Sequence, residues 1–137
     1  MNKYEQIDIS GDVGLRIRGE NIEDLFMHAA EGMFSLITDT SVLEKKEERE
    51  VKVGADSIGD LLVQWLNELI FLFDTYGFVG RSFLIDVKDN KLTSKITGGK
   101  FNPDVNESRL LIKAATYHRL SLEKISSGWE AVVIFDI

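Results

Sequence analysis

Two stretches of the chain place their hydrophobic residues on one side of a helix. Within residues 22–37 and again within residues 58–73, these residues recur at intervals of three and four. This spacing is typical of a helix that buries one face. Asn21 precedes the first stretch as an N-cap, and Ser57 with Asp60 three residues later resembles a capping box. The pattern therefore predicts two helices, which begin directly after Asn21 and Ser57.

Elsewhere hydrophobic and polar residues alternate, which is typical of half-buried strands. The predicted strands cover residues 13–17, 51–53, 83–87, 92–96, 109–115, 120–125 and 129–137. Two loops are predicted, at the charged residues 44–50 and at residues 100–108, which hold the only proline. A strand pair, a helix, a strand, a helix and a run of antiparallel strands predict an α+β domain, with two helices packed on mostly antiparallel sheet.

The second predicted helix has unusually little polar surface. Val63, Phe71 and Leu72 add hydrophobic bulk outside its main stripe. The polar positions are reduced to a narrow line: Ser57, Asp60, Gln64, Asn67 and Glu68. Such a helix is either nearly enclosed or presents part of its second face to a partner.

Composition limits the class of protein. With 137 residues, of which 44% are hydrophobic, the chain suits one domain spanning residues 1–137. The 23 acidic and 16 basic residues give a net charge of −7, which argues against direct, high-affinity binding to nucleic acid. Cysteine is absent, so thiolate chemistry and disulfides are excluded. We see no signal peptide or membrane span and expect a cytoplasmic protein without membrane contact.

Acidic residues at two places could bind a cation. Asp8 and Asp12 flank a Ser-Gly turn, and Asp136 directly precedes the carboxylate of Ile137. An aspartate in a turn usually binds nearby main-chain N–H groups, and a terminal acid is usually only solvated. If Asp12, Asp136 and the Ile137 carboxylate converge, however, a divalent ion would relieve their repulsion. Calcium or magnesium suits this oxygen set better than zinc, and manganese stays open.

Three further residues have a structural and a functional interpretation. Lys113 lies in an alternating segment and needs either exposure or an acidic partner. His118 is either a hydrogen-bonded structural group or a proton carrier or auxiliary ligand. Glu68 belongs to the solvated stripe or pairs with Lys113 or His118. His28 is most simply a surface residue. The phosphate-binding loop, the serine elbow, the HExxH zinc motif and paired CxxC motifs are all absent, so we assign no catalytic residue.

Five segments, in order along the whole chain, resemble the archease family. They are DISGDVGLRIRG, NIEDLFMHAAEGMFSLITD, DLLVQWLNELIFLFD, LLIKAATYHRL and WEAVVIFDI. The resemblance implies an embedded duplication of a strand-helix-strand-strand unit. It also implies a chaperone-like protein cofactor of an RtcB-type RNA ligase in tRNA splicing or RNA repair. Such a cofactor promotes guanylylation and multiple turnover of the ligase and is not itself an enzyme. By resemblance, Asp12, Asp136 and the Ile137 carboxylate bind a metal ion, usually calcium.

The chain departs from the family at one position of the opening motif. The family commonly has DHTAD where this chain has DISGD, so Ile9 replaces a histidine. Any role of that histidine is lost or is taken by His118. We expect the acidic tip to dock transiently near the active site of the ligase. Two alternatives stay open. One is a general chaperone or scaffold for an RNA-modifying enzyme, which binds its partner through Trp65 and Phe71 on the second helix. The other is a small metal-dependent phosphoesterase that uses the same carboxylates.

Overall fold

The structure is a computed structural model that describes residues 2–137, and it contains two sheets and two long helices. In chain order the elements are β1 (Tyr4–Ile9), β2 (Asp12–Gly19), α1 (Ile22–Ile37), the short helix η1 (Thr40–Val42), β3 (Glu47–Gly54), α2 (Ile58–Tyr76), β4 (Phe78–Lys88), β5 (Lys91–Lys100), β6 (Ala114–Ala115), β7 (Ser121–Ile125) and β8 (Gly128–Asp136). The larger sheet has the order β1-β2-β8-β6, with β7 also on β8, and the smaller has the order β3-β5-β4. All of these pairs are antiparallel, which confirms the predicted α+β class.

The order of the strands reveals an internal duplication. In the unit β3-α2-β4-β5, the first strand pairs with the last, which gives the sheet order β3-β5-β4. The unit β2-α1-β7-β8 has the same arrangement, with the order β2-β8-β7. The unit β3-α2-β4-β5 is inserted into the other unit, between α1 and β7. The chain therefore contains the embedded duplication that the family resemblance implies.

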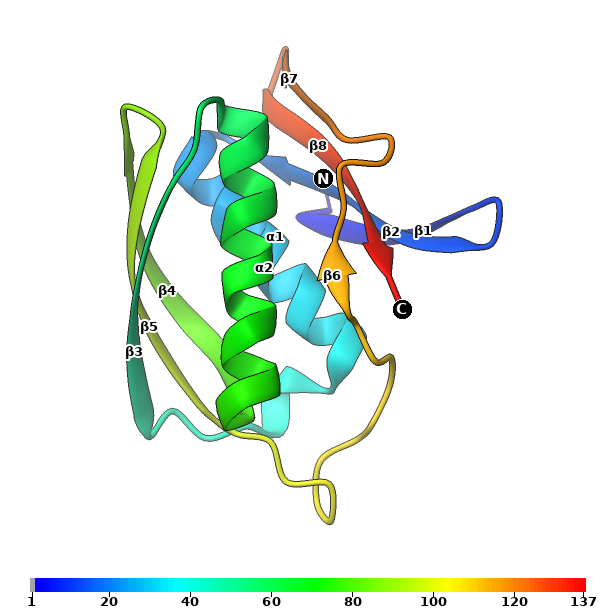
Figure 1. The fold of residues 1–137 in the computed structure, drawn as a ribbon, viewed down its shortest axis with the longest axis vertical. Coiled ribbons are helices and arrows are strands. Elements are labelled where there is room, and N and C mark those ends of the chain that lie inside the picture. Colours follow the sequence, from blue (N-terminus) through cyan, green and yellow to red (C-terminus); the bar gives the residue numbers. More distant parts are fainter. Residues whose placement is uncertain (1) are drawn as a thin grey trace.

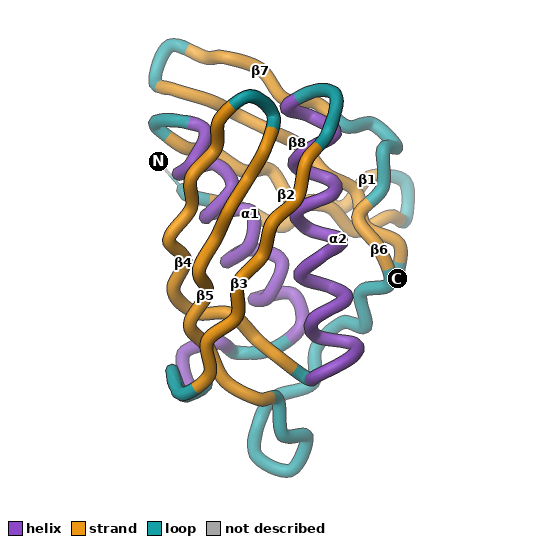
Figure 2. The backbone as a smooth tube through the Cα atoms, turned by 60° about the vertical axis from the view of Figure 1, so that its left-hand side comes forward, coloured by secondary structure: helices purple, strands orange, loops and turns teal. Residues whose placement is uncertain are grey.

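The two helices form a layer between the two sheets (Figures 1 and 2). Trp65 of α2 lies at the centre of this layer with none of its surface exposed, and its indole N–H donates to the carbonyl of Phe26 at 3.0 Å. The ring of Phe83 from β4 packs edge-on against Trp65 and stacks on Phe34 of α1, with ring centroids 6.3 and 6.4 Å apart. One aromatic cluster therefore joins both helices to the smaller sheet.

Both helices begin where the sequence predicts. The Asn21 side chain accepts a hydrogen bond from the N–H of Asp24 at 2.8 Å, and the Ser57 hydroxyl accepts one from the N–H of Asp60 at 3.1 Å. The capping box at Ser57 is only half formed, because the Asp60 carboxylate accepts a hydrogen bond from the Tyr117 hydroxyl instead. Local capping by Ser57 therefore determines where α2 begins, while the distant Tyr117 binds the Asp60 carboxylate that would complete the capping box.

The predicted loop at residues 44–50 is wrong in its second half. Glu47–Glu50 forms the beginning of β3, where Glu48 pairs with Thr97 and Glu50 with Lys95 of β5. Glu48 and Glu50 are exposed, and the Lys95 ammonium lies 3.6 Å from the Glu48 carboxylate. A strand with one solvated face tolerates such charges, because main-chain pairing with β5 holds it in place.

The predicted strand at residues 109–115 is also largely wrong, because only Ala114 and Ala115 join the sheet. The main-chain N–H groups of residues 109 and 110 donate to the carbonyls of residues 37 and 36, both at 2.9 Å. The Arg109 guanidinium donates to the carbonyl of Ser35 at 2.8 Å. The last carbonyls of a helix have no partner within the helix. This segment therefore caps the end of α1 and cannot extend the sheet.

The second helix is nearly enclosed. Val63 and Leu72, which add bulk outside its main stripe, are both buried. Phe71 is the exception, with 52% of its surface exposed. Despite this hydrophobic character, no helix within residues 2–137 has the length and apolarity that crossing a membrane requires.

Candidate functional site

Asp12 and Asp136 lie opposite one another at the ends of β2 and β8. Ser10 and Gly11 form a two-residue turn with φ of 52° and 86°, so β2 begins at Asp12. Val13 pairs with Phe135, and the antiparallel register sets Asp12 opposite Asp136 one position further along. Opposite residues project from the same face of a sheet, with Cβ atoms about 5 Å apart. The C-terminus follows directly and lies beside β6 (Figure 1).

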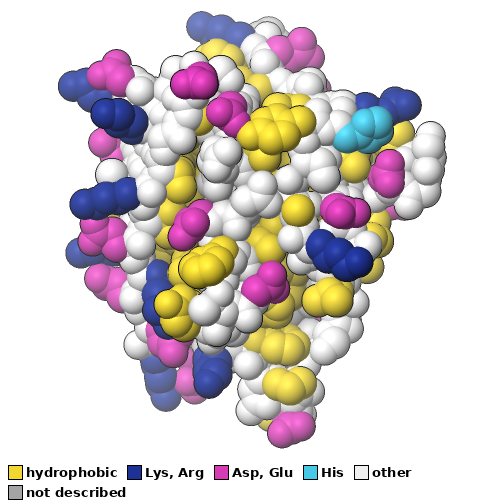
Figure 3. All heavy atoms as spheres, in the orientation of Figure 1, with side chains coloured by type: hydrophobic (Ala, Val, Ile, Leu, Met, Phe, Trp, Pro, Cys, Tyr) yellow, Lys and Arg dark blue, Asp and Glu magenta, His cyan; other side chains and the backbone are white. Residues whose placement is uncertain are grey.

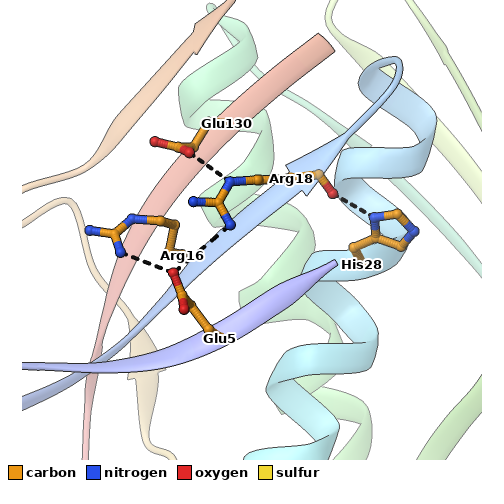
Figure 4. A network of polar contacts seen from close by, with 5 residues as sticks. All are labelled: Glu5, Arg16, Arg18, His28 and Glu130. Atoms are coloured by element: carbon orange, nitrogen blue, oxygen red, sulfur yellow. Dashed lines mark hydrogen bonds and ion pairs between the residues drawn. The ribbon is translucent and has the colours of Figure 1, made fainter. Parts of the chain in front are cut away.

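Two arginines on the outer face of β2 are paired with glutamates of the neighbouring strands. Arg16 donates to the Glu5 carboxylate at 3.0 Å, and Arg18 donates to the Glu130 carboxylate at 2.9 Å (Figure 4). Asp12 lies on the same face of β2 as both arginines, because residues two apart in a strand share a face. Within the described residues, neither the Asp12 nor the Asp136 carboxylate makes a hydrogen bond or an ion pair. Their mutual repulsion therefore has no counter-charge.

His28 belongs to the arginine network and is not a free surface residue. Its Nδ1–H donates to the main-chain carbonyl of Arg18 at 2.5 Å, and the ring is half-buried. This contact joins α1 to β2 (Figure 4). The prediction of a simple surface histidine is therefore wrong, because a carbonyl on the neighbouring strand offers the ring a partner.

The donor atoms at the strand ends suit a hard divalent ion. Among residues 2–137, no three His, Cys, Asp or Glu side chains come together in a metal-binding group. The donor set that the sequence predicts contains only two such side chains, and its third predicted member is the main-chain carboxylate of Ile137. All of its donors are carboxylate oxygens, which calcium and magnesium prefer. Asp12, Asp136 and Ile137 are all exposed, so water can complete the coordination.

Asp8 is separated from this pair by the pleat of the sheet. It pairs with Val13 in β2, while Asp12 pairs with Ile9 in β1. Adjacent residues of a strand project to opposite faces. The side chain of Asp8 therefore lies on the other face of the sheet from those of Asp12 and Asp136.

Lys113, His118 and Glu68 do not form the ion pairs that the sequence left open. Lys113 is exposed, which confirms the simpler interpretation, and its main-chain N–H donates to the carbonyl of Asp136 at 2.7 Å. His118 is also exposed, and its main-chain N–H donates to the Thr116 hydroxyl at 3.3 Å. Glu68 is half-buried, and over residues 2–137 it pairs with neither Lys113 nor His118. Lys113 is therefore tied to the carboxylate pair through the main chain alone.

Sequence reasoning missed the partner of the polar stripe on α2. The Tyr117 hydroxyl donates to the Asp60 carboxylate and accepts from the Gln64 amide at 3.4 Å. The hydrogen bond to Asp60 raises the pKa of Tyr117 above its ordinary value, with a smaller contribution from desolvation. One turn further along, the Asn67 side chain binds the main chain of Ala115. The narrow polar line was the available signal, but its partners lie some fifty residues away in sequence.

Comparison with known proteins decides the family. Residues 4–137 match the archease protein family (MTH1598/TM1083). The chain belongs to the archease family. Among its relatives, the protein archease of Saccharolobus islandicus is 37% identical and that of Pyrococcus abyssi is 34% identical, and both alignments cover 100% of each chain. The resemblance carried by the five sequence segments is thereby confirmed.

Solved archease-like structures share the fold. Protein 1598 of Methanobacterium thermoautotrophicum is 33% identical over 100% of both chains and superimposes with a TM-score of 0.85. An archease described as a possible chaperone, from Thermotoga maritima, covers 97% of this chain and 96% of its own. It is 23% identical with a TM-score of 0.70, so it supports the archease fold alone.

Proposed function

We propose that this chain is a metal-binding protein cofactor of an RtcB-type RNA ligase in tRNA splicing or RNA repair. In this role it promotes guanylylation of the ligase and its multiple turnover, and it works in the cytoplasm. The observation that carries the proposal is the facing pair Asp12 and Asp136, which stands at one end of an archease fold without a counter-charge. Membership of the archease family supports it, because the sequence resemblance to that family implies a metal at the same residues.

In this proposal, the carboxylates of Asp12, Asp136 and Ile137 hold the ion, with calcium preferred over magnesium and manganese. The bound ion supplies positive charge that offsets the repulsion among the three groups. The main-chain N–H of Lys113 holds the carbonyl of Asp136 and so keeps the end of β8 in place. The exposed position of the site leaves it accessible to a protein partner.

Charge supports a transient complex with the ligase. The net charge of −7 is complementary to the basic cleft that an RNA ligase needs, and complementary fields speed encounter. An acidic cofactor that stayed in this cleft would compete with RNA, so release must follow activation. Transfer of a nucleotide to the ligase depends mainly on positioning and electrostatics, which a docked acidic site can influence.

The test is RNA joining by the RtcB-type ligase of the same organism, at low ligase and excess RNA. We expect the ligase to turn over many times only with this protein present, and we expect Asp12→Asn and Asp136→Asn to abolish the effect. Asp104→Asn, in an exposed loop, is the matched control. Unchanged turnover with an active ligase would reject the proposal. Hydrolysis of a phosphoester by the isolated protein would favour the phosphoesterase alternative.

A scaffold function is the second candidate, and the structure changes its predicted anchors. Trp65 is fully buried, and its indole is hydrogen-bonded to the Phe26 carbonyl, so it cannot contact a partner. The prediction that Trp65 anchors a partner is therefore wrong. Phe71 is exposed and packs edge-on against Tyr76, which is 46% exposed, with ring centroids 6.5 Å apart. In the orientation of Figure 3, which is that of Figure 1 with α2 in front, hydrophobic side chains are scattered among acidic ones on the visible face.

Substitution separates the scaffold from the metal-dependent cofactor. If the scaffold function holds, Phe71→Ser abolishes activation of the ligase while Asp12→Asn leaves it intact. If the metal-binding function holds, loss of activation follows Asp12→Asn. Both variants change exposed side chains, so each should fold.

A further inference from the structure

Asn67 of α2 completes the hydrogen bonding of the short strand β6. Its amide Nδ2–H donates to the carbonyl of Ala115 at 3.1 Å, and its Oδ1 accepts from the N–H of Ala115 at 2.9 Å. One side chain therefore makes both of the bonds that a neighbouring strand would make. This is the only contact within residues 2–137 in which a side-chain amide binds both main-chain groups of one residue.

The position of Ala115 in the sheet explains why these bonds matter. Ala115 lies opposite Phe135, and the next residue, Thr116, donates its N–H to the carbonyl of Ile134 at 3.0 Å. In an antiparallel ladder, hydrogen-bonded and non-hydrogen-bonded pairs alternate. Because Thr116 is hydrogen-bonded to β8, Ala115 directs its own N–H and C=O away from β8. Ala115 is only 5% exposed, so water does not readily satisfy these groups. Asn67 takes the place of the missing strand.

Strand β6 is also the neighbour of Asp136 on the side away from Asp12. Ala114 pairs with Asp136, and the N–H of Lys113 donates to the Asp136 carbonyl at 2.7 Å. With only two residues in the ladder, β6 has little pairing of its own to hold it. Its attachment to α2 through Asn67 therefore helps to determine where the end of β8 lies.

We propose that Asn67 is a positioning residue for the cation site of Asp12, Asp136 and Ile137. It acts through Ala115 and β6, without touching the ion, and this inference rests on the metal site of the proposed function. Removing the two hydrogen bonds frees β6, and the carboxylates of Asp136 and Ile137 then lose their alignment with Asp12. Loss of a group that hydrogen-bonds a metal ligand directly commonly lowers metal affinity by about 10- to 100-fold, and we take the lower end of this range for Asn67, which acts through β6.

The test measures calcium binding by titration calorimetry with calcium alone, so no ligase is needed. Asn67→Leu keeps a similar shape and removes both hydrogen bonds. We expect its Kd for calcium to rise by about tenfold. Gln64→Ala is the matched control, because Gln64 lies one turn away on the same stripe and makes only the 3.4 Å contact to Tyr117. It should keep the wild-type Kd.

A second control separates positioning from general loss of stability. Leu92→Ala removes a buried side chain from β5, in the other sheet, and should lower the melting temperature without changing the Kd. Exchange of the amide hydrogens of Lys113 and Ala115, measured without metal, should be faster in Asn67→Leu than in either control. If Asn67→Leu does not fold, Asn67→Ala gives the same comparison with a smaller side chain.

The outcomes distinguish this inference from the proposed function. Faster exchange in Asn67→Leu with an unchanged Kd would mean that Asn67 only anchors β6, and it would overturn the inference while leaving the metal site intact. Absence of calcium binding in the wild type, with Asp12→Asn no different, would reject the metal site and the inference together.

Discussion

Replacing Asp12 by Asn should change stability in opposite directions without and with calcium. Without metal, the substitution removes one of two facing negative charges. At the separation of about 5 Å expected for opposite residues, the repulsion in water is about 0.8 kcal/mol, and salt lowers it further. For a domain of this size, 1 kcal/mol corresponds to about 4 °C. In chelator at low salt, Asp12→Asn should therefore melt about 2 to 3 °C above the wild type.

With calcium the order should reverse. An ion that binds only the native state, at a hundred times its Kd, adds about 2.7 kcal/mol of stability. This corresponds to about 10 °C for the wild type. Asp12→Asn lacks one of the three proposed carboxylates and should gain much less. The wild type should then melt above the variant, although it melts below it in chelator.

Scanning calorimetry at low ionic strength, in chelator and then in excess calcium, measures both effects. Asp8→Asn is the control, since it removes the same charge from the other face of the sheet and should keep the calcium shift. The reasoning is refuted if Asp12→Asn destabilises the protein in chelator and calcium shifts both proteins equally. The two carboxylates would then neither repel one another nor share an ion.

Three further predictions concern the core, the polar stripe and the chain end. Trp65→Phe removes the hydrogen bond from the indole to the Phe26 carbonyl, which keeps only its partner within α1. It should cost about 0.5 to 1.5 kcal/mol in urea unfolding, whereas a loss near zero would contradict the central role of this bond. Asp60→Asn should lower the pKa of Tyr117 toward the ordinary value of 10.0 in an ultraviolet titration, with Tyr117→Phe identifying the signal. Because the folded-state pKa of Tyr117 is raised, the stability that this bond contributes is complete below pH 10.0 and is lost as pH rises through the folded-state pKa. An unchanged titration of Tyr117 in Asp60→Asn would exclude the bond as the cause of the raised pKa. Adding one glycine after Ile137 removes its carboxylate and should weaken calcium binding while leaving the melting temperature in chelator unchanged, and equal calcium affinity would exclude this carboxylate as a ligand.

Features that depend on nearby residues could be predicted from the sequence. Asn21 and Ser57 cap helices through hydrogen bonds to residues three positions away, so the two helix starts needed no tertiary information. The alternating strands and the Ser10-Gly11 turn are local in the same sense. The predicted strand over residues 109–115 failed in its first part because the N–H groups of residues 109 and 110 bind the end of α1, which alternation along the chain cannot reveal.

The amino-acid sequence by itself determined which chemistry the chain can offer: oxygen donors at Asp12 and at the Asp136–Ile137 end, no thiolates, and a helix with one narrow polar line. Only the tertiary structure decided which of these groups meet. The register of β2 and β8 sets Asp12 opposite Asp136, and the pleat excludes Asp8 from the pair. The physical reason is that capping and alternation act over a few residues, whereas the contact between Asn67 and Ala115 exists only after the sheets and helices have packed.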